Sequence, residues 1–320
     1  MAKVDIAVPC YNYGRFLRDC VASVLDQGTA DVRVLIIDNA STDNSVEIAR
    51  ALAAKDRRIS VSAHATNLGP HASFNEGVDW ASADYFMILC SDDLLVPGAL
   101  ASMVAAMDRD PRTSFAYGND VEWNYCESPS PPVLGAPSAA RWRVREGLEF
   151  IYERCRFPDR HVSYSTILAR TSAQKAAGHY RPELPHADDF EMLLRLACFG
   201  RVADTRDIVG VRRIHQSNRS QDYILKRTGH IVERLDAFES FFANDGRTLP
   251  GAERLYGIAR SSLSGQAYWR GIKDLVRGRR SALQLLGLSI RLAPMTAVVP
   301  PFGYLARMDR TLYKSIVGLP

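Results

Sequence analysis

The first third of the chain alternates two patterns of apolar residues. Short β-branched runs predict buried strands, and segments whose apolar residues recur every three or four positions predict helices that cover a sheet. The predicted strands span residues 4–8, 32–37, 59–63, 85–89 and 114–117. Helices are expected over 16–25 and 71–80, from an N-cap at Ser41 through Ala54, and from Pro97. This alternation predicts an α/β fold with a mostly parallel central sheet.

Polar segments follow four of these strands, and they are residues 9–12, 38–41, 67–69 and 91–93. Because ligands of open α/β sheets bind outside the carboxyl ends of the strands, all four are expected at one binding edge. Asp92 and Asp93 are adjacent carboxylates after a buried strand, which is unfavourable without a positive partner. A divalent cation that carries a diphosphate would supply that partner, while Tyr11 could stack on a base and Asp38 could accept a base N–H. For any single loop, an ordinary turn or helix cap remains an equal alternative.

Other sequence features exclude several classes of protein. No G-x-G-x-x-G follows the first strand and no G-x-x-x-x-G-K-[ST] occurs, which argues against a dinucleotide dehydrogenase and a P-loop enzyme. The six cysteines form no C-x-x-C pair and no cluster with zinc spacing, so a reduced, cytoplasmic chain is expected. We expect neither a secretory signal nor a spanning helix, because no run of about 20 apolar residues occurs.

The segments V-P-C-Y-N (8–12), D-N-A-S (38–41), N-L-G (67–69) and C-S-D-D (90–93) together resemble the family 2 glycosyltransferases of the GT-A fold. Residues 186–196 and 213–218 resemble that family's acidic helix and its R-x-H segment. The resemblance covers about residues 3–220. It implies a Rossmann-like, mostly parallel sheet flanked by helices, and an inverting transferase that uses a nucleoside-diphosphate sugar with Mg²⁺ or Mn²⁺.

The resemblance also implies roles for individual residues. Asp93 would be the direct metal ligand, and His215 a further ligand to the metal or a phosphate, unless it is a hydrogen-bonded structural histidine. Asp189 would be the general base, unless Asp188 and Asp189 only complement the dipole of their helix. Ser91 stands where the family commonly has the first acid of a D-x-D triplet, which leaves the number of metal ligands open. The residues that would hold the donor are Pro9, Tyr11, Asn12, Asp38, Asn67, Ser91 and Asp92.

The same resemblance narrows the substrates. Uridine is the favoured base, although Tyr11 and Asp38 could serve thymidine equally. Processive members carry Q-x-x-R-W, whereas residues 216–220 end in Ser220, so a non-processive enzyme is expected. Its acceptor would be a saccharide or lipid-linked saccharide in lipopolysaccharide or exopolysaccharide synthesis. The alternatives are a sugar nucleotidyltransferase, whose glycine-rich basic loop is missing after the first strand, and a non-catalytic nucleotide-sugar-binding scaffold.

We expect a catalytic domain over residues 1–221 and a helical C-terminal region over 222–320. The donor half of the catalytic domain would span about 1–125 and the acceptor-side half about 141–221. A proline-rich loop over 126–140 would separate them, and a strand over 161–168 would border the acceptor.

The positive charge of the chain is concentrated from Arg270 onward. Only two acidic residues oppose nine basic ones there: Arg270, Lys273, Arg277, Arg279, Arg280, Arg291, Arg307, Arg310 and Lys314. Because this region is also apolar, it is expected either to lie peripherally on the inner face of the cell membrane or to pack on the core or form a homodimer contact. Nucleic-acid binding is not expected, since no recognition motif accompanies the charge.

Overall fold

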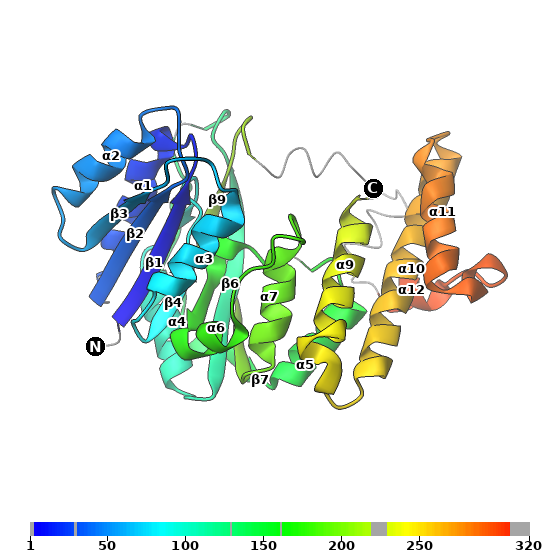
Figure 1. Ribbon diagram of the computed structural model, residues 1–320. Helices are drawn as coiled ribbons and strands as arrows, with labels where there is room; N and C mark the ends of the chain where they lie inside the picture. The colour runs from blue at the N-terminus through cyan, green and yellow to red at the C-terminus, as the bar shows by residue number, and fades with distance from the viewer. Residues whose placement is uncertain (1–2, 29–30, 129, 161, 219–228, 308–320) are drawn as a thin grey trace. The chain divides into compact units, whose positions relative to one another are not determined.

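The computed structural model describes residues 3–28, 31–128, 130–160, 162–218 and 229–307. Its central feature is a nine-stranded sheet in the order β3-β2-β1-β4-β8-β6-β9-β5, with β7 paired to β9 (Figure 1). The strands are β1 Lys3–Cys10, β2 Asp31–Asp38, β3 Ile59–Ala63, β4 Tyr85–Ile88, β5 Leu94–Leu95, β6 Thr113–Asn124, β7 Arg143–Arg145, β8 Ile167–Arg170 and β9 Arg201–Ile214.

The four strands β3, β2, β1 and β4 are all parallel. Apolar side chains project from both faces of β1. On one face Val4, Ile6 and Val8 belong to the same core cluster as the buried residues of α1 (Gly14–Leu25), and on the other Ala7 lies against Gly77 of α3 (Pro70–Trp80). Strands buried on both faces become near-continuous apolar runs in sequence, which is why β1, β2 and β4 were predictable. The more exposed β3 instead alternates apolar residues with serine. Beyond β4, the strand β8 runs antiparallel to both β4 and β6, whereas β9 runs parallel to β6. The predicted α/β fold with a mostly parallel central sheet is confirmed.

Eleven α-helices are described, and the two that were predicted over 16–25 and 71–80 begin one or two residues before their predicted starts. Those of the first third are α1 Gly14–Leu25, α2 Ser45–Ala53, α3 Pro70–Trp80 and α4 Ala99–Asp108. The later ones are α5 Gly147–Arg156, α6 Thr171–Ala177, α7 Asp188–Ala197, α9 Gly229–Ala243, α10 Ala252–Val276, α11 Ser281–Leu292 and α12 Phe302–Arg307. None of these described helices combines the length and the apolar character needed to cross a membrane.

Two predicted helix starts are wrong. Ser41 does not cap α2, because Ala40 takes a left-handed φ of 59° and the chain makes a further loop before Asn44 precedes the helix. The hydroxyl of Ser41 instead accepts a hydrogen bond from the N–H of Asn12. Pro97 lies outside α4, because Gly98, with a φ of 77°, separates it from the first helical residue.

Two predicted strands have different bounds. The strand expected over 114–117 is the long strand β6, which continues to Asn124 because β9 pairs with it over that length, with shifts of register. The strand expected over 161–168 begins only at Ile167, after a 3-10 turn over Tyr164–Thr166. The proline-rich loop was expected over 126–140, and its described residues through Ser138 contain no helix or strand. At its end a 3-10 helix forms over Ala139–Arg141.

The chain forms two compact units. Unit 1 comprises Met1–Gly147, His161–Glu183 and Arg195–Gln216, and it contains the sheet. Unit 2 comprises Leu148–Arg160, Leu184–Leu194 and Ser217–Pro320, and α10 packs in it between α9 and α11 (Figure 1). Some predicted features lie outside the described residues: Arg219 and Ser220, the proposed boundary at 221–222, and Arg310 and Lys314 of the basic tail.

Candidate active site

The loops after β1 and β2 are tied together at the carboxyl edge of the sheet. The Asn12 N–H donates to Ser41 Oγ at 2.9 Å, and Asn12 Oδ1 accepts from the Thr42 N–H at 2.7 Å. Asn12 and Ala40 both have a φ of 59°, a region that residues with a side chain rarely adopt. Such strained positions persist only where their surroundings hold them, and they often lie at ligand-binding sites.

Asp38, at the end of β2, has an unsatisfied buried acceptor. Its side chain is buried, and Oδ2 accepts a hydrogen bond from the Ser41 N–H at 2.9 Å. Oδ1 is also buried but has no hydrogen-bond partner among the described residues. A buried carboxylate oxygen without a donor is unfavourable, so this atom is ready to accept an N–H from a ligand. Tyr11 is exposed after β1, and Pro9 lies within that strand beside Ile37.

A second network supports the loop after β3. The buried side chain of Asn39 donates to Asn67 Oδ1 and to the Gly69 carbonyl, each at 3.0 Å. Its own oxygen lies 2.8 Å from His64 Nδ1, whose Nε2 lies 2.6 Å from Glu76 Oε2. The predicted donor residue Asn67 therefore holds the shape of its loop. Asn39 and His64 were missed, and only their position beside predicted strand ends could have indicated them.

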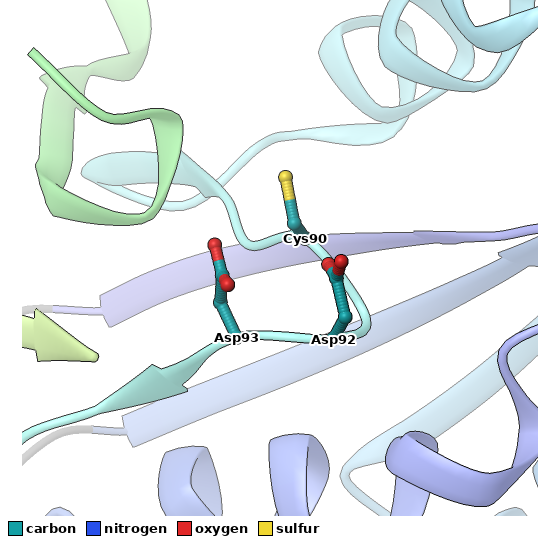
Figure 2. Close-up of side chains that lie close together, drawn as sticks. All are labelled: Cys90, Asp92 and Asp93. Carbon is teal, nitrogen blue, oxygen red and sulfur yellow. The ribbon is translucent and has the colours of Figure 1, made fainter. Parts of the chain in front are cut away.

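The loop after β4 places three metal-ligating atoms together. Cys90 Sγ and one carboxylate oxygen each of Asp92 and Asp93 lie within 4.8 Å of one another. Figure 2 shows the three side chains on the same side of the loop. Both acids are buried, as is Ser91 between Cys90 and Asp92. The sequence identified the two acids but not the sulfur of Cys90 as a third donor atom.

Two distant segments hold Asp93 in place. The Ser165 hydroxyl donates to its Oδ2 at 2.5 Å, and the Arg213 N–H donates to its Oδ1 at 3.1 Å. Burial raises the pKa of Asp93 well above its usual range, and the neighbouring charge of Asp92 raises it further. A bound cation would reverse both effects, because it favours the ionised carboxylates. Two carboxylates and a sulfur in reach of one another therefore fit a divalent metal ion.

His215 is brought to the acidic pair through Asp92. Its Nε2 lies 3.2 Å from Asp92 Oδ2, and its ring packs against Phe16 at 4.6 Å and Tyr13 at 5.2 Å between centroids. The guanidinium of Arg213, two residues earlier, lies 4.5 Å from the centroid of the same Phe16 ring. Phe16 of α1 thus orients both members of the R-x-H segment.

Asp189 lies in the first turn of α7, within unit 2. Its Oδ1 accepts a hydrogen bond from the Phe190 N–H at 2.6 Å. Burial raises the pKa of Asp189 to about 6, the charge of Arg234 opposes this, and Asp188 adds to it. A carboxyl group with a pKa near 6 is better matched to proton transfer at neutral pH than an ordinary aspartate.

The candidate site lies at the carboxyl edge of an α/β sheet and contains an acidic pair that, with Cys90, could hold a metal ion. The family model described as Glycosyl transferase family 2 matches residues 5–166, which is more than half of the chain. The chain therefore belongs to glycosyl transferase family 2.

Curated relatives agree with this assignment. An uncharacterized glycosyltransferase of Haemophilus influenzae is 34% identical over 107 residues, which cover 33% of this chain and 43% of that protein. A Campylobacter jejuni protein named GalNAc(5)-diNAcBac-PP-undecaprenol beta-1,3-glucosyltransferase is 29% identical over 105 residues, covering 32% of this chain and 34% of that protein. The chain spans less than half the length of these relatives.

Solved structures share the fold. TarS of S. aureus in complex with UDP aligns with 98% of this chain and 86% of its own, with a TM-score of 0.62 and 17% identity. Mannosyltransferase PcManGT from Pyrobaculum calidifontis, in complex with GDP-Man and Mn²⁺, aligns with 99% of this chain and 82% of its own, with a TM-score of 0.62 and 16% identity. The predicted GT-A fold is confirmed.

Proposed function

We propose that this protein is an inverting, metal-dependent, non-processive glycosyltransferase. It would move a sugar from a nucleoside diphosphate to a saccharide or lipid-linked saccharide. The observation that carries this proposal is the group of Cys90, Asp92 and Asp93 at the edge where Asp38 keeps an unpartnered buried oxygen. A diphosphate with its cation and a base N–H would satisfy the two features together.

UDP-sugar is the proposed donor. Asp38 Oδ1 would accept the imide N–H of uracil, and the exposed ring of Tyr11 would stack on the base. Pro9, Asn12, Asn67 and Ser91 would shape the pocket around the nucleotide. The two solved relatives are bound to UDP and to GDP-Man. Asp38 could accept the imide N–H of thymine equally, so the choice of uridine rests on the resemblance to the family.

Asp93, with Asp92 and Cys90, would hold Mg²⁺ or Mn²⁺, and Mn²⁺ is the ion bound in the PcManGT complex. When bound, this ion neutralises the negative charge that develops on the leaving diphosphate. The Ser165 hydroxyl and the Arg213 N–H fix the direction of the Asp93 carboxylate. His215 would act through Asp92, by orienting that carboxylate and by donating to a phosphate oxygen.

Asp189 is proposed as the general base. It would take the proton of the acceptor hydroxyl as that oxygen attacks the anomeric carbon and the bond to the diphosphate breaks. A single displacement converts an α-linked donor into a β-linked product. The pKa of about 6 leaves Asp189 ionised at neutral pH and able to accept the proton.

The acceptor is proposed from the name of one curated relative. The Campylobacter jejuni relative is named for a saccharide on undecaprenyl diphosphate, a lipid-linked acceptor. We extend this to a role in lipopolysaccharide or exopolysaccharide synthesis at the cytoplasmic face of the cell membrane. The catalytic part would be residues 1–221, and residues 222–320 would form a helical appendage.

The first test is donor binding. Calorimetry of the full chain should detect Mn²⁺-dependent UDP binding, and Asp93→Asn should weaken it by at least about tenfold, as expected for loss of a charged ligand. Asp79→Asn, which changes an exposed acid of unit 1, is the matched control. Unchanged metal-dependent binding in Asp93→Asn would remove this residue from the site.

The second test is the chemistry itself. Asp189→Asn should abolish transfer while it keeps UDP binding, because the amide cannot take the proton. Released UDP identifies glycosyl transfer, whereas released pyrophosphate would identify a nucleotidyltransferase. Donor binding with no turnover toward water or any saccharide would favour a non-catalytic scaffold instead.

A further inference from the structure

The outward face of α11 is apolar. Ala282, Leu285, Ser289 and Leu292 are buried on its inner side, where α11 packs along α10. The opposite side presents Leu283, which is 76% exposed, and Ile290, which is 42% exposed, with Gly287 between them at helical spacing. A surface helix ordinarily turns polar residues outward, so this stripe is not explained by the packing of unit 2.

Exposed apolar residues also lie at both ends of α11. Before it, Leu275 and Val276 are exposed in the last turn of α10, and Val276 is 84% exposed. After it, the segment through the 3-10 turn Pro294–Ala297 exposes Met295, Val298, Val299 and Phe302. Single exposed apolar residues are normal, but an apolar stretch sustained over one helix and its two flanks marks an interaction surface.

The charged residues of this segment are all basic. Residues 275–307 include five arginines and no aspartate or glutamate. Arg277 and Arg280 are exposed in the turn between α10 and α11, and Arg291 is exposed beside Ile290. Arg279 is matched by the buried Asp274 at 3.2 Å, so the other exposed arginines carry the surface charge. We call residues 275–302 the basic apolar face.

We propose that the basic apolar face binds the surface of a membrane that contains anionic lipid. Its apolar side chains would enter the boundary between headgroups and acyl chains, and its arginines would contact lipid phosphates. Arginine suits this position, because its aliphatic stem can lie among apolar groups while the guanidinium reaches the phosphate. The inference uses no residue of the candidate active site.

A second copy of the chain is a less suitable occupant. A two-fold interface places the same patch on both subunits, so arginines of this face would meet arginines of the partner. No acidic side chain within 275–307 could compensate for them. An anionic lipid surface complements both the charge and the apolar area.

The test is flotation of the full chain with vesicles of phosphatidylcholine alone, or of phosphatidylcholine with phosphatidylglycerol. We expect binding to the anionic vesicles that weakens in about 1 M salt, where the Debye length is about 3 Å. Arg277→Gln/Arg280→Gln should lower the partition coefficient roughly 30-fold. Leu283→Gln/Val298→Gln should lower it by more than about tenfold without any change of charge.

The matched controls lie at the other end of α10 and on another helix of unit 2. Arg247→Gln/Arg254→Gln removes the same charge just before and in the first turn of α10, and Arg254 lies about 35 Å along the helix from Arg277. Leu148→Gln changes an exposed leucine of α5. Both controls should partition as the unchanged protein does.

Three results would overturn the proposal: no vesicle binding, equal binding to neutral and anionic vesicles, or variants of the basic apolar face that bind like the controls. A mass that halves in Leu283→Gln/Val298→Gln, with unchanged partition, would assign the face to a second copy. Vesicle binding and Mn²⁺-dependent UDP binding are measured separately on each variant, so failure of one proposal does not resemble failure of the other.

Discussion

Asp93 illustrates how much of the candidate site depends on contacts far along the chain. Its two oxygens accept hydrogen bonds from Ser165 and Arg213, which lie 72 and 120 residues away in sequence. Both donors lie at or beside strands that flank the acidic loop. The carboxylate is therefore held in one direction, so less freedom would be lost on binding of the proposed cation.

Cys90 leads to a prediction about the choice of metal. Sulfur favours softer ions, so Mn²⁺ and Cd²⁺ should gain affinity from Cys90 and Mg²⁺ should not. Cys90→Ser should weaken Mn²⁺-dependent UDP binding several-fold and leave Mg²⁺-dependent binding nearly unchanged. Titration with Cd²⁺ should give an ultraviolet sulfur-to-metal absorption band that Cys90→Ser abolishes.

The exposed Cys126 supplies the control. Cys126→Ser should keep both the absorption band and the preference for Mn²⁺. A band of equal strength in Cys90→Ser would show that the sulfur of Cys90 is not a ligand.

Arg234 leads to a prediction about pH. Its buried guanidinium lies 4.2 Å from the Phe190 ring centroid, and its charge holds down the pKa of Asp189 against the effect of burial. Arg234→Met keeps an unbranched apolar stem there but removes the charge. The pKa of Asp189 should therefore rise above about 6, and the acidic limb of kcat against pH should move upward by roughly one pH unit.

The pH profile of kcat measures this directly. Turnover of Arg234→Met should be low at pH 6 and recover by about pH 8, because the base is again ionised there. Arg254→Met, on the exposed side of α10, should leave the limb in place. A uniform loss at every pH would mean that Arg234 supports the fold rather than the ionisation of Asp189.

Single residues of the site were predictable to different degrees. Asp38, Asp92 and Asp93 could be found because each directly follows an apolar run that predicts a buried strand. The Ser165 contact could not be found, because it depends on β8 lying between β4 and β6. The spacing of residues along the chain does not indicate that β8 inserts between β4 and β6.

At the scale of elements, the packing of α3 against β1 depends on a glycine. A Cβ at Gly77 would lie 2.5 Å from the Ala7 Cβ, well inside contact distance. Gly77→Ala should therefore destabilise the protein by about 1–3 kcal/mol, as overpacking does. Urea unfolding followed by circular dichroism measures the change.

Two further variants separate crowding from helix propensity. Gly257→Ala, in α10 with nothing near its Cβ position, should instead stabilise by about 0.5–1 kcal/mol. Ala7→Gly should restore part of the stability lost in Gly77→Ala, because it removes the opposing methyl group. Equal effects of Ala7→Gly in both backgrounds would contradict the close contact.

Helices and strands were predictable where their pattern of apolar residues follows directly from their burial. The strands β1 to β4 are parallel, and the apolar runs of the mostly buried β1, β2 and β4 were visible in the sequence. The more exposed β3 was visible as an alternation of apolar residues with serine. The length of β6 was not, because Gly118, Asn119 and Asp120 interrupt the apolar run and only pairing with β9 keeps them extended. The start of α2 was misplaced because a serine that resembles a cap serves the Asn12 loop instead.

At the scale of the molecule, stability in acid should depend on Asp5. Burial alone would raise the pKa of Asp5, but the Arg33 guanidinium and the N–H groups of Ser82 and Ala83 outweigh it and hold the pKa below the ordinary 3.8. The two Arg33 contacts measure 2.8 and 2.7 Å. Because the folded pKa is lowered, this stabilisation is complete above pH 3.8 and is lost as the pH falls through the folded pKa.

Asp5→Asn should therefore lower the free energy of unfolding by about 2–3 kcal/mol at pH 7. The difference from the unchanged protein should shrink toward zero below the folded pKa, where Asp5 is also neutral. Urea unfolding at pH 7 and pH 3 checks this, with Asp31→Asn, an exposed acid of β2, as the control. A difference that persists undiminished at pH 3 would point to packing rather than charge.

The strand order has a consequence for the nascent chain. A ribosome releases β1 to β4 first, and these four parallel strands can pair once Ile88 has emerged. The next neighbours of β4 are made much later, since β8 ends at Arg170 and β9 at Ile214. At about 5–20 residues per second, several seconds of synthesis pass with one edge of the sheet open. The acidic loop acquires its Arg213 hydrogen bond only at the end of this interval, so nascent chains shorter than that length have an incomplete candidate metal site.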